Sequence, residues 1–236
     1  MDKLYIVIPA YNEQENLGTV IDEWYPIIEK YHGDGASRLV IIDDGSKDRT
    51  LELLKEYAET RPFLQPLTKE NGGHGSAVLF GYHYALEQGA DYVFQTDSDG
   101  QTLVSEFDMF WQARNDHDMV IGWRKGRQDG VSRVFVTRVL KWVVRICFGT
   151  AVQDANTPYR IMKAEKLKEY IGLVPDDFFL SNVLLTVIFT KRGTVKYLPI
   201  TFRPRQGGAN SINMKKIIRV GWQALKDFKK INRLLG

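Results

Sequence analysis

The stretch Tyr92–Gln101, YVFQTDSDGQ, joins an apolar run to two aspartates one residue apart and a glycine. Its first half, Tyr92–Thr96, is β-branched and aromatic, which predicts a buried strand that ends in a polar loop. Runs of the same kind occur at Leu4–Ile8, Leu39–Ile42 and Met119–Ile121. The sequence therefore predicts at least four short buried strands in its first half.

Segments with helical spacing separate these strands. They are Glu13–Lys30, Asp48–Glu59, Ser76–Gln88 and Val104–Arg114. Alternation of strands and helices predicts an α/β fold with a mostly parallel sheet that is covered by helices on both faces.

The second half has a less regular pattern. Helices are expected at Arg133–Phe148 and Asn213–Leu235, with a strand pair around Thr194–Arg203. Because no internal repeat or Gly/Ser linker interrupts the chain, one domain over residues 1–236 is expected.

Composition narrows the class of protein. The chain is 44% hydrophobic and 26% charged, with a net charge of +3, and it lacks zinc-finger spacing and RNA-binding aromatic motifs. The single cysteine, Cys147, excludes an internal disulfide and suits a reducing cytosol. The N-terminus does not resemble a signal peptide, and the uncharged stretch Phe178–Thr190 is too short to span a bilayer. We expect a protein that is soluble or lies on a membrane surface.

Three polar loops follow three of the expected strands. They are PAYNE at residues 9–13, DDGS at 43–46 and DSDGQ at 97–101. Ligands of parallel sheets bind beyond the carboxyl ends of the strands, so these loops should lie together in space.

Asp97 and Asp99 have two interpretations. As residues i and i+2 at a strand end, they form either a solvated turn or a site for a shared cation. Oxygen ligands suit Mg²⁺ or Mn²⁺, which take further ligands from water and substrate phosphates, and Gln101 adds a neutral oxygen. Asp43 could in turn bond a base or ribose, or cap the next helix.

The glycine-rich turn NGGHGSA, Asn71–Ala77, opens a helix, and free N–H groups in such a turn favour an anion. It matches neither the Walker loop nor the G-x-G-x-x-G pattern. His74 could contact a phosphate or only begin the helix.

Four motifs together resemble glycosyltransferase family 2: VIPAYNEQENL, VIIDDGSKDRT, NGGHGSA and QTDSDGQ, in this order. Within that family the chain is most similar to dolichol-phosphate mannose synthases and bacterial polyprenyl-phosphate glycosyltransferases. That likeness also rests on IGWR, SRVFVTR, DANTPYRIM and FRPRQGGANS. The resemblance implies a GT-A fold, a nucleotide-sugar donor linked to UDP or GDP, a divalent metal and inversion at the anomeric carbon. It also implies a nucleotide-binding half at about 1–122 and an acceptor-side half at about 123–236.

The resemblance also assigns site residues. The nucleotide-sugar set is Pro9, Tyr11, Asn12, Glu13, Asp43, Asp44, Gly73, His74, Asp97 and Ser98. The metal set is Asp97, Asp99 and Gln101, and the phosphate and acceptor set is Arg124, Arg133, Thr137, Arg203 and Arg205. Asp99 and Arg124 are expected to be catalytic. A metal and arginines suit this reaction because negative charge develops on the departing diphosphate.

A base is needed for an alcohol acceptor but not for an ionised phosphate. Asp176 and Asp177 are candidates for the base, or they only begin a helix after Pro175. Asp154 and Arg160 lie in a motif of the acceptor side, or they form a structural pair.

Two basic amphipathic helices bear on the acceptor. The expected C-terminal helix carries Lys215, Lys216, Arg219, Lys226, Lys229, Lys230 and Arg233 between apolar residues. Arg138, Lys141 and Arg145 share one face of the other helix. Such helices lie on a membrane surface or pack on their own domain with a solvated basic face. A polyprenyl phosphate acceptor at the inner face of the cell membrane would explain both helices. Either surface binding would then suffice or a membrane-protein partner would supply the anchor, unless the acceptor is not a lipid.

Two further functions remain open. The acceptor could be a saccharide hydroxyl in capsule or cell-wall synthesis, or the chain could be an inactive nucleotide-sugar-binding module. A glycosidase is disfavoured because its two carboxylates flank the scissile bond, whereas Asp97 and Asp99 are better placed to share an ion.

Overall fold

The structure, a computed structural model, describes residues 2–32, 34–124, 141–176, 178, 180–203, 228 and 232. Its strands are β1 (Leu4–Ala10), β2 (Arg38–Asp43), β3 (Leu64–Thr68), β4 (Tyr92–Gln95), β5 (Met119–Arg124), β6 (Arg160–Lys163) and β7 (Val195–Ile200). Its helices are α1 (Leu17–Lys30), α2 (Thr50–Thr60), α3 (His74–Glu87), α4 (Phe107–Ala113), α6 (Ala164–Ile171) and α7 (Ser181–Arg192). A 3₁₀ turn, η1 (Val104–Glu106), precedes α4, and residues 141–148 are also helical.

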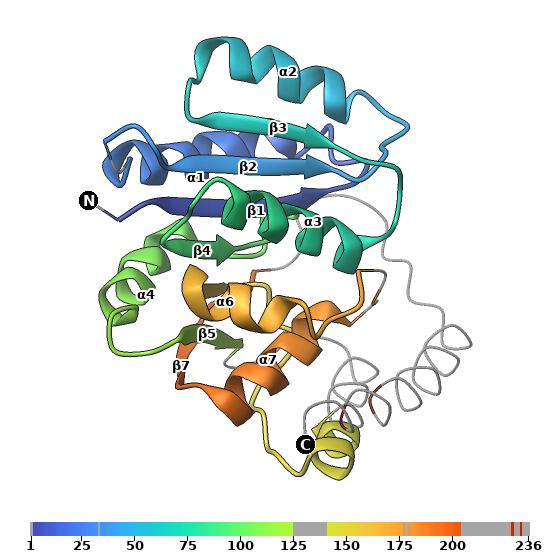
Figure 1. The fold of residues 1–236 in the computed structure, drawn as a ribbon. Coiled ribbons are helices and arrows are strands. Elements are labelled where there is room, and N and C mark those ends of the chain that lie inside the picture. Colours follow the sequence, from blue (N-terminus) through green and yellow to red (C-terminus); the bar gives the residue numbers. More distant parts are fainter. Residues whose placement is uncertain are drawn as a thin grey trace.

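The described strands form a seven-stranded sheet in the order β3-β2-β1-β4-β6-β5-β7 (Figure 1). Pairing is parallel at β1–β2, β2–β3, β1–β4 and β5–β7, and antiparallel on both sides of β6. Only β6 among them therefore runs against the others, which confirms the expected mostly parallel sheet. Strands from both halves of the chain pair in it, since β4 lies beside β6.

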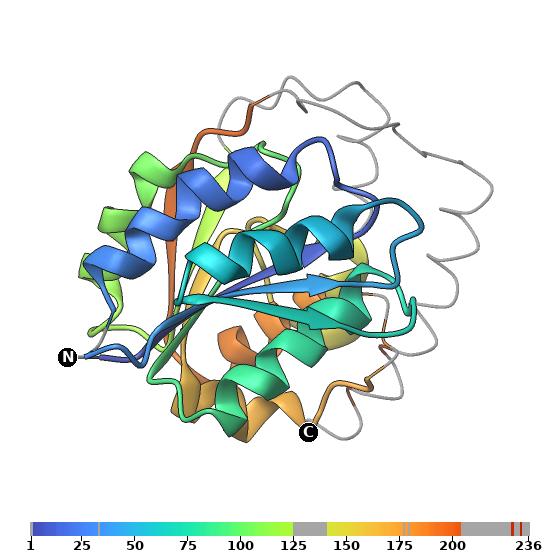
Figure 2. The same ribbon diagram turned by 90° about the horizontal axis from the view of Figure 1, so that it is seen from above.

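The alternation of side chains along β1 explains why both faces are covered. Ile6 and Ile8 pack with α1, α2 and α4 in one core, while Tyr5 and Val7 pack with α3, α6 and α7 in the other. Viewed from above, α1 and α4 lie on one side of the sheet and α3 on the other (Figure 2). Helices on both faces were predicted, and the structure confirms them.

The order of the strands creates a switch point beside β1. The chain runs from β1 outward to β2 and β3, then returns to place β4 on the other side of β1. Loops that leave the carboxyl ends of β1 and β4 therefore diverge to opposite sides, the usual place for a ligand in such sheets.

Several predicted elements differ from the structure. The strand pair expected at Thr194–Arg203 is wrong, because the described residues there form one strand, β7, which pairs with β5. β3 and β6 were not predicted. The sequence of β3, LQPLT, contains Pro66, which is tolerated because β3 lies at the sheet edge.

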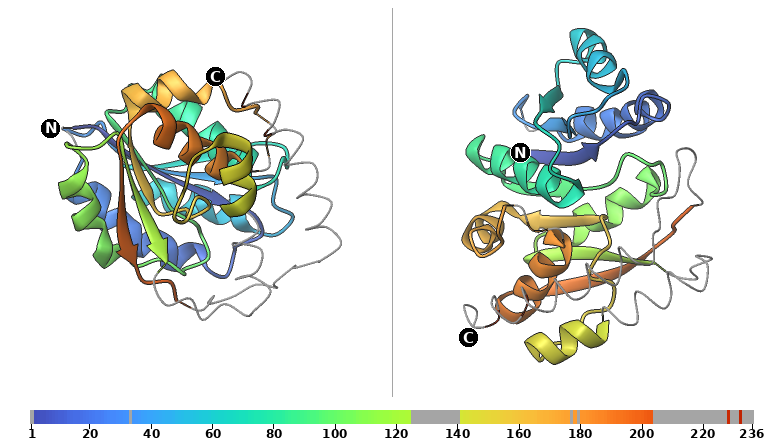
Figure 3. Two further views of the ribbon diagram at one scale, coloured as in Figure 1. Left: turned by 90° about the horizontal axis from the view of Figure 1, so that it is seen from below. Right: turned by 90° about the vertical axis from the view of Figure 1, so that its right-hand side faces the viewer.

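Residues 141–148 lie at the opposite end of the molecule from α2 (Figures 1 and 3). They confirm the last part of the helix expected at Arg133–Phe148, whereas residues 133–140 lie outside the described residues. The helix expected at Asn213–Leu235 also lies outside them, apart from Phe228 and Asn232. No helix within the described part of the chain is long and apolar enough to cross a membrane.

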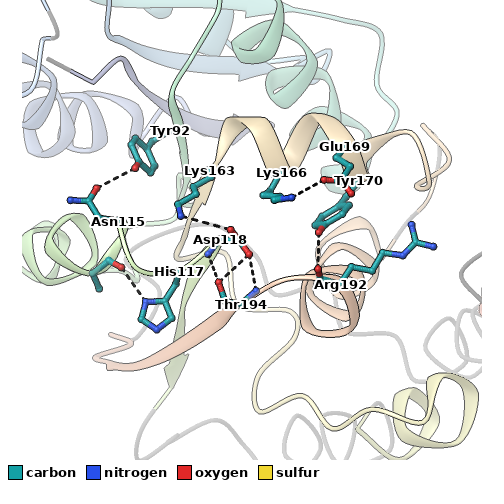
Figure 4. A network of polar contacts seen from close by, with 11 residues as sticks. Tyr92, Asn115, His117, Asp118, Lys163, Lys166, Glu169, Tyr170, Arg192 and Thr194 are labelled. Atoms are coloured by element: carbon teal, nitrogen blue, oxygen red, sulfur yellow. Dashed lines mark hydrogen bonds and ion pairs between the residues drawn. The ribbon is translucent and has the colours of Figure 1, made fainter.

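A polar network stabilises the amino ends of β5 and β7, at the edge away from the polar loops (Figure 4). The Asp118 carboxylate accepts hydrogen bonds from the backbone N–H and the hydroxyl of Thr194, at 2.8 and 3.0 Å. Burial alone would raise the pKa of Asp118, but the bonds from Thr194 lower it on balance. This network fixes the register of the β5–β7 pair.

Candidate functional site

The carboxyl ends of six strands meet at one edge of the sheet, and the predicted polar loops lie there. The residues at this edge are Pro9–Glu13 after β1, Asp43–Ser46 after β2, Asp97–Gln101 after β4, Arg124 at the end of β5, and Arg203 after β7. The convergence of the three loops after β1, β2 and β4 was predicted from the strand pattern, whereas Arg124 and Arg203 were expected near phosphates from the family resemblance.

Hydrogen bonds join the first two loops. The Asn12 N–H donates to the Ser46 hydroxyl at 3.0 Å, and the Asn12 amide oxygen accepts from the Lys47 N–H at 2.8 Å. Asn12 has a φ of 54°, a left-handed conformation that asparagine tolerates. Beside it, the Tyr11 side chain is 43% exposed and the buried Glu13 donates its N–H to Thr50. The joined loops leave Tyr11 as an exposed ring above the sheet edge.

Asp43 is buried beneath this pair of loops. Its carboxylate accepts hydrogen bonds from the Ser46 N–H at 3.1 Å and the Thr68 hydroxyl at 2.9 Å. Asp43 therefore shapes the turn, and its predicted contact with a base or ribose stays a prediction.

Asp44 binds the glycine-rich loop. Its carboxylate accepts hydrogen bonds from the N–H groups of Gly72 and Gly73, at 3.0 and 2.8 Å, and from the Lys69 ammonium at 3.0 Å. Its carbonyl accepts a bond from the Asn71 amide at 2.8 Å. The sequence predicted an anion near the N–H groups of this loop, and in the structure the Asp44 side chain bonds two of them.

The glycine-rich loop places His74 next to Asp97. His74 is the first residue of α3, and its Nε2 lies 2.9 Å from Oδ1 of Asp97. Desolvation lowers the pKa of His74, but the charge and hydrogen bond of Asp97 outweigh it, so the pKa lies above its usual value. The hydrogen bond orients one oxygen of Asp97.

Asp97, Ser98, Asp99 and Gln101 form the turn after β4. Asp97 and Asp99 are partly exposed, and Asp99 accepts the Gln101 N–H at 3.1 Å. No three His, Cys, Asp or Glu side chains in the described part of the chain form a metal-binding group. Two carboxylates at a solvent-facing turn nevertheless fit Mg²⁺ or Mn²⁺, since such ions complete their shell with water and substrate phosphates. The expected metal site is therefore compatible with the residues present.

Gln101 also joins the β4 loop to the end of β7. Its side-chain amide donates to the Arg203 carbonyl, and its own carbonyl accepts the Arg203 N–H, both at 2.8 Å. Since a carbonyl only accepts, the amide NH₂ must face Arg203, and the amide oxygen faces away from it. Gln101 can thus hold Arg203 at the site and still offer an oxygen to a cation.

The side chain of Arg124 forms an ion pair with the Asp154 carboxylate. Its Nε and Nη2 donate to the two oxygens of Asp154 at 2.9 and 2.8 Å, and both side chains are largely buried. The guanidinium also lies 5.0 Å from the centroid of the Phe202 ring. Arg124 therefore lies near Arg203, and its predicted contact with phosphate stays a prediction.

Arg160 is fully buried at the start of β6, and reasoning from sequence did not find its role. Its guanidinium donates to the carbonyls of Ala155, Thr157 and Asn182 and to the Thr186 hydroxyl. A structural pair with Asp154 was one alternative, but among the described residues Asp154 accepts side-chain hydrogen bonds from Arg124. The sequence feature that could have indicated its burial is the position of Arg160 at the start of the short apolar run RIM.

The structure does not bring Asp176 to the aspartates. Its carboxylate is 89% exposed and lies 3.6 Å from Nε2 of His83. His83 is nine residues beyond His74 in α3, which is about 13 Å along the helix axis. The assignment of Asp176 as a base thus gains no support from the geometry. Asp177, Arg133, Thr137 and Arg205 lie outside the described residues.

Comparisons with known proteins agree with this geometry. A family model described as Glycosyl transferase family 2 matches residues 5–171. The undecaprenyl-phosphate 4-deoxy-4-formamido-L-arabinose transferase of Pectobacterium atrosepticum is 26% identical over 206 residues, which are 81% of this chain and 62% of that protein. The polyprenol monophosphomannose synthase of Mycolicibacterium smegmatis is 25% identical over 222 residues, which are 90% of this chain and 82% of that protein. The chain therefore spans less than two thirds of the first relative.

The fold also has solved counterparts. A crystal structure of glucosyl-3-phosphoglycerate synthase from Mycobacterium tuberculosis, in complex with Mn²⁺, UDP-glucose and phosphoglyceric acid, matches with a TM-score of 0.70 at 18% identity. The match covers 98% of this chain and 80% of that one. At this identity the likeness establishes the fold, which is the expected GT-A fold.

Proposed function

Because the chain belongs to glycosyl transferase family 2, we propose that it transfers a sugar from a nucleotide-sugar donor to a polyprenyl phosphate with the help of Mg²⁺ or Mn²⁺. The observation that carries this proposal is the convergence at the switch point. The loop after β1, the loop after β4 with Asp97 and Asp99, and Arg203 after β7 share one edge of the sheet.

The nucleoside of the donor would lie over the loops after β1 and β2. Tyr11 offers an exposed ring there, next to Pro9, Asn12 and Glu13. Aromatic faces and backbone polar groups are suited to a flat base with hydrogen-bonding edges. Asp43 and Asp44 would lie beneath the nucleoside, since both carboxylates already accept hydrogen bonds from the loops.

The diphosphate would lie near Asp97, Asp99 and Gln101, which would hold the divalent ion. When bound, such an ion offsets the negative charge that develops on the departing diphosphate. His74 orients Asp97, and Gln101 holds Arg203 beside the turn. The Arg203 guanidinium would then add a fixed positive charge next to the leaving group.

A phosphate acceptor suits this site because an ionised phosphate oxygen attacks without a base. Asp176 lies away from Asp97 and Asp99, which disfavours a base at this position. The similar protein of Pectobacterium atrosepticum is named an undecaprenyl-phosphate 4-deoxy-4-formamido-L-arabinose transferase, and that of Mycolicibacterium smegmatis a polyprenol monophosphomannose synthase. Both names support a polyprenyl phosphate as the acceptor proposed here.

A membrane-borne acceptor agrees with the surface of residues 141–148. Trp142 and Ile146 are 68% and 73% exposed, one turn apart, with exposed Lys141 and Arg145 beside them. Tryptophan and basic side chains are typical of surfaces that contact the bilayer interface. We propose that the protein acts as a peripheral protein at the cytoplasmic face of the membrane.

The test is sugar transfer from UDP- and GDP-linked sugars to undecaprenyl phosphate, with Mn²⁺, with Mg²⁺ and with EDTA. The expected result is a lipid-linked sugar that forms with metal and falls at least about 100-fold in Asp99→Ala. Transfer to a saccharide instead of the lipid would contradict the acceptor. No transfer from any donor would favour an inactive binding module and contradict the enzyme.

A further inference from the structure

The turn that carries Asp97, Asp99 and Gln101 lies between two buried threonines. Thr96 precedes the turn and Thr102 follows it, and the two residues are 0% and 2% exposed. Their hydroxyl oxygens lie 2.8 Å apart, so one hydroxyl donates a hydrogen bond to the other. This bond joins the two ends of the turn, whereas Asp97 and Asp99 between them are partly exposed.

The core of the protein holds both ends of this turn. The Thr96 N–H donates to the Val7 carbonyl in β1 at 3.3 Å. On the other side, the Leu103 carbonyl next to Thr102 accepts a hydrogen bond from the Tyr159 hydroxyl at 2.9 Å. Because Tyr159 is completely buried, this end of the turn is fixed as well. The bond between the two threonines therefore connects two anchored points of the chain.

Packing alone does not require two hydroxyl groups at this place. A buried hydroxyl costs free energy unless it is hydrogen-bonded. Two apolar groups of the same shape, in place of a bonded pair, are close to neutral for stability. What the threonine pair adds is a directional bond with a defined length, which restricts the conformations of the turn that it closes.

The conformation of the turn decides where the expected metal ligands lie. Gly100 has a φ of 67°, in the left-handed region, and the Asp99 carboxylate accepts the Gln101 N–H at 3.1 Å. These features shape the middle of the turn, and the threonine pair fixes its ends. Loss of a group that orients metal ligands typically lowers the affinity for the metal by about 10–100-fold.

We propose that Thr96 and Thr102 are positioning residues, whose hydroxyl–hydroxyl bond holds the turn in the conformation that binds the divalent ion. This inference rests on the proposed function, in which Asp97, Asp99 and Gln101 hold the ion. Both threonines act through the conformation of the turn and not through contact with the ion or the donor.

Valine is the informative replacement because it has the shape of threonine and lacks the hydroxyl. Thr96→Val and Thr102→Val each leave one buried hydroxyl without its partner. The midpoint of thermal unfolding of the metal-free protein should therefore fall by about 5 °C in each. The double variant removes both hydroxyls, so its midpoint should return to within about 2 °C of wild type.

The second measurement is Mn²⁺ binding to the full chain with UDP and with GDP, followed by the electron paramagnetic resonance signal of the free ion. The half-saturating Mn²⁺ concentration should rise about tenfold in both single valine variants. It should rise as much in the double variant, although that variant regains its stability. Thr96→Ser and Thr102→Ser keep the hydroxyl and should bind Mn²⁺ as wild type does. Recovered stability without recovered affinity distinguishes a positioning role from a structural one.

Thr194→Val is the matched control. The Thr194 hydroxyl bonds Asp118 at the opposite edge of the sheet (Figure 4). Its loss should lower the thermal midpoint and leave Mn²⁺ binding unchanged.

Three results would overturn the role of the threonine pair. They are wild-type Mn²⁺ affinity in the double valine variant, serine variants that lose as much affinity as the valine variants, and a thermal midpoint of the double variant no higher than those of the single variants. If a single valine variant fails to fold, the double variant and the serine variants still decide. Absence of Mn²⁺ binding to wild type with either nucleotide would instead overturn the proposed function.

Discussion

Replacement of Arg160 by methionine tests how the buried polar contacts support the sheet edge. Arg160 is fully buried, and its N–H groups bond three backbone carbonyls and one hydroxyl. Methionine fills a similar space but donates no hydrogen bond. The Arg160→Met variant therefore leaves the acceptors in place and removes their donors.

The cost follows from the acceptors that lose a partner. The Thr157 carbonyl loses both of its bonds from Arg160. The Ala155 carbonyl keeps a bond from the Thr186 hydroxyl at 2.9 Å, and the Asn182 carbonyl keeps the backbone N–H of the α7 helix ladder. The unsatisfied Thr157 carbonyl costs about 1–3 kcal/mol, each bond lost at Ala155 and Asn182 costs about 0.5–1.5 kcal/mol more, and removal of a desolvated cation returns part of this. We expect a loss of about 3 kcal/mol in the free energy of unfolding.

Urea unfolding, followed by far-ultraviolet circular dichroism, measures this loss. Arg49→Met is the control, because the Arg49 side chain is 61% exposed and bonds only neighbouring acids in the described structure. That variant should unfold as wild type does. If the free energy of unfolding of Arg160→Met fell by less than about 1 kcal/mol, the hydrogen bonds of the buried guanidinium would not stabilise the fold as argued here.

Three further outcomes are expected. Asp118→Asn should lower the free energy of unfolding by about 1.5–3 kcal/mol at neutral pH, because the bonds from Thr194 lose a charged acceptor. Although burial raises it, the bonds from Thr194 hold the pKa of Asp118 below its usual value in the folded state. This contribution is therefore present above the unfolded-state pKa and disappears as pH falls through the lowered pKa, and acid titration of stability in both proteins measures it. Gly81→Ala should cost about 1–3 kcal/mol in urea unfolding, since its Cβ would meet side chains of β1 and β2 at 2.5 and 2.7 Å. Glutamate at both Trp142 and Ile146 should abolish co-sedimentation with anionic vesicles.

Each of these outcomes has a contrary result. If the free energies of unfolding of Asp118→Asn and wild type differed by the same amount at every pH, the charge of Asp118 would not be the cause of the difference. A neutral effect of Gly81→Ala would mean that α3 moves freely on the sheet. Phe80→Glu serves as the control for the vesicles, since Phe80 is an exposed aromatic on α3, and an equal loss there would contradict a specific surface at 141–148.

The architecture could be predicted because buried strands of a parallel sheet have a strong pattern. β1, β2 and β4 are apolar runs that end in polar loops, β5 is a further apolar run, and α1 and α3 have clear helical spacing. The position of these loops at one edge then follows from the parallel order. Prediction failed where packing overrides pattern: β3 contains proline at a sheet edge, and β6 is a short run that begins with a buried arginine.

The candidate site could be predicted in its residues but not in its contacts. The family resemblance assigned Asp44 and His74 to the nucleotide sugar and Arg124 to a phosphate. It could not indicate that Asp44 binds the glycine loop or that Asp154 binds Arg124, because those pairs are brought together by the tertiary fold. Hydrogen bonds between residues distant in sequence leave no local pattern to read.

The most direct measurement is the thermal stability of the protein with a panel of UDP- and GDP-linked sugars, with and without Mn²⁺. A ligand of the folded state at about a hundred times its dissociation constant stabilises by about 2.7 kcal/mol, which is about 5–10 °C for a chain of this size. We expect one nucleotide class to give such a shift with Mn²⁺, and the Asp97→Asn, Asp99→Asn double variant to lose it. No shift with any nucleotide sugar at millimolar concentration, or an equal shift in the double variant, would contradict a metal-assisted nucleotide-sugar site at this edge of the sheet.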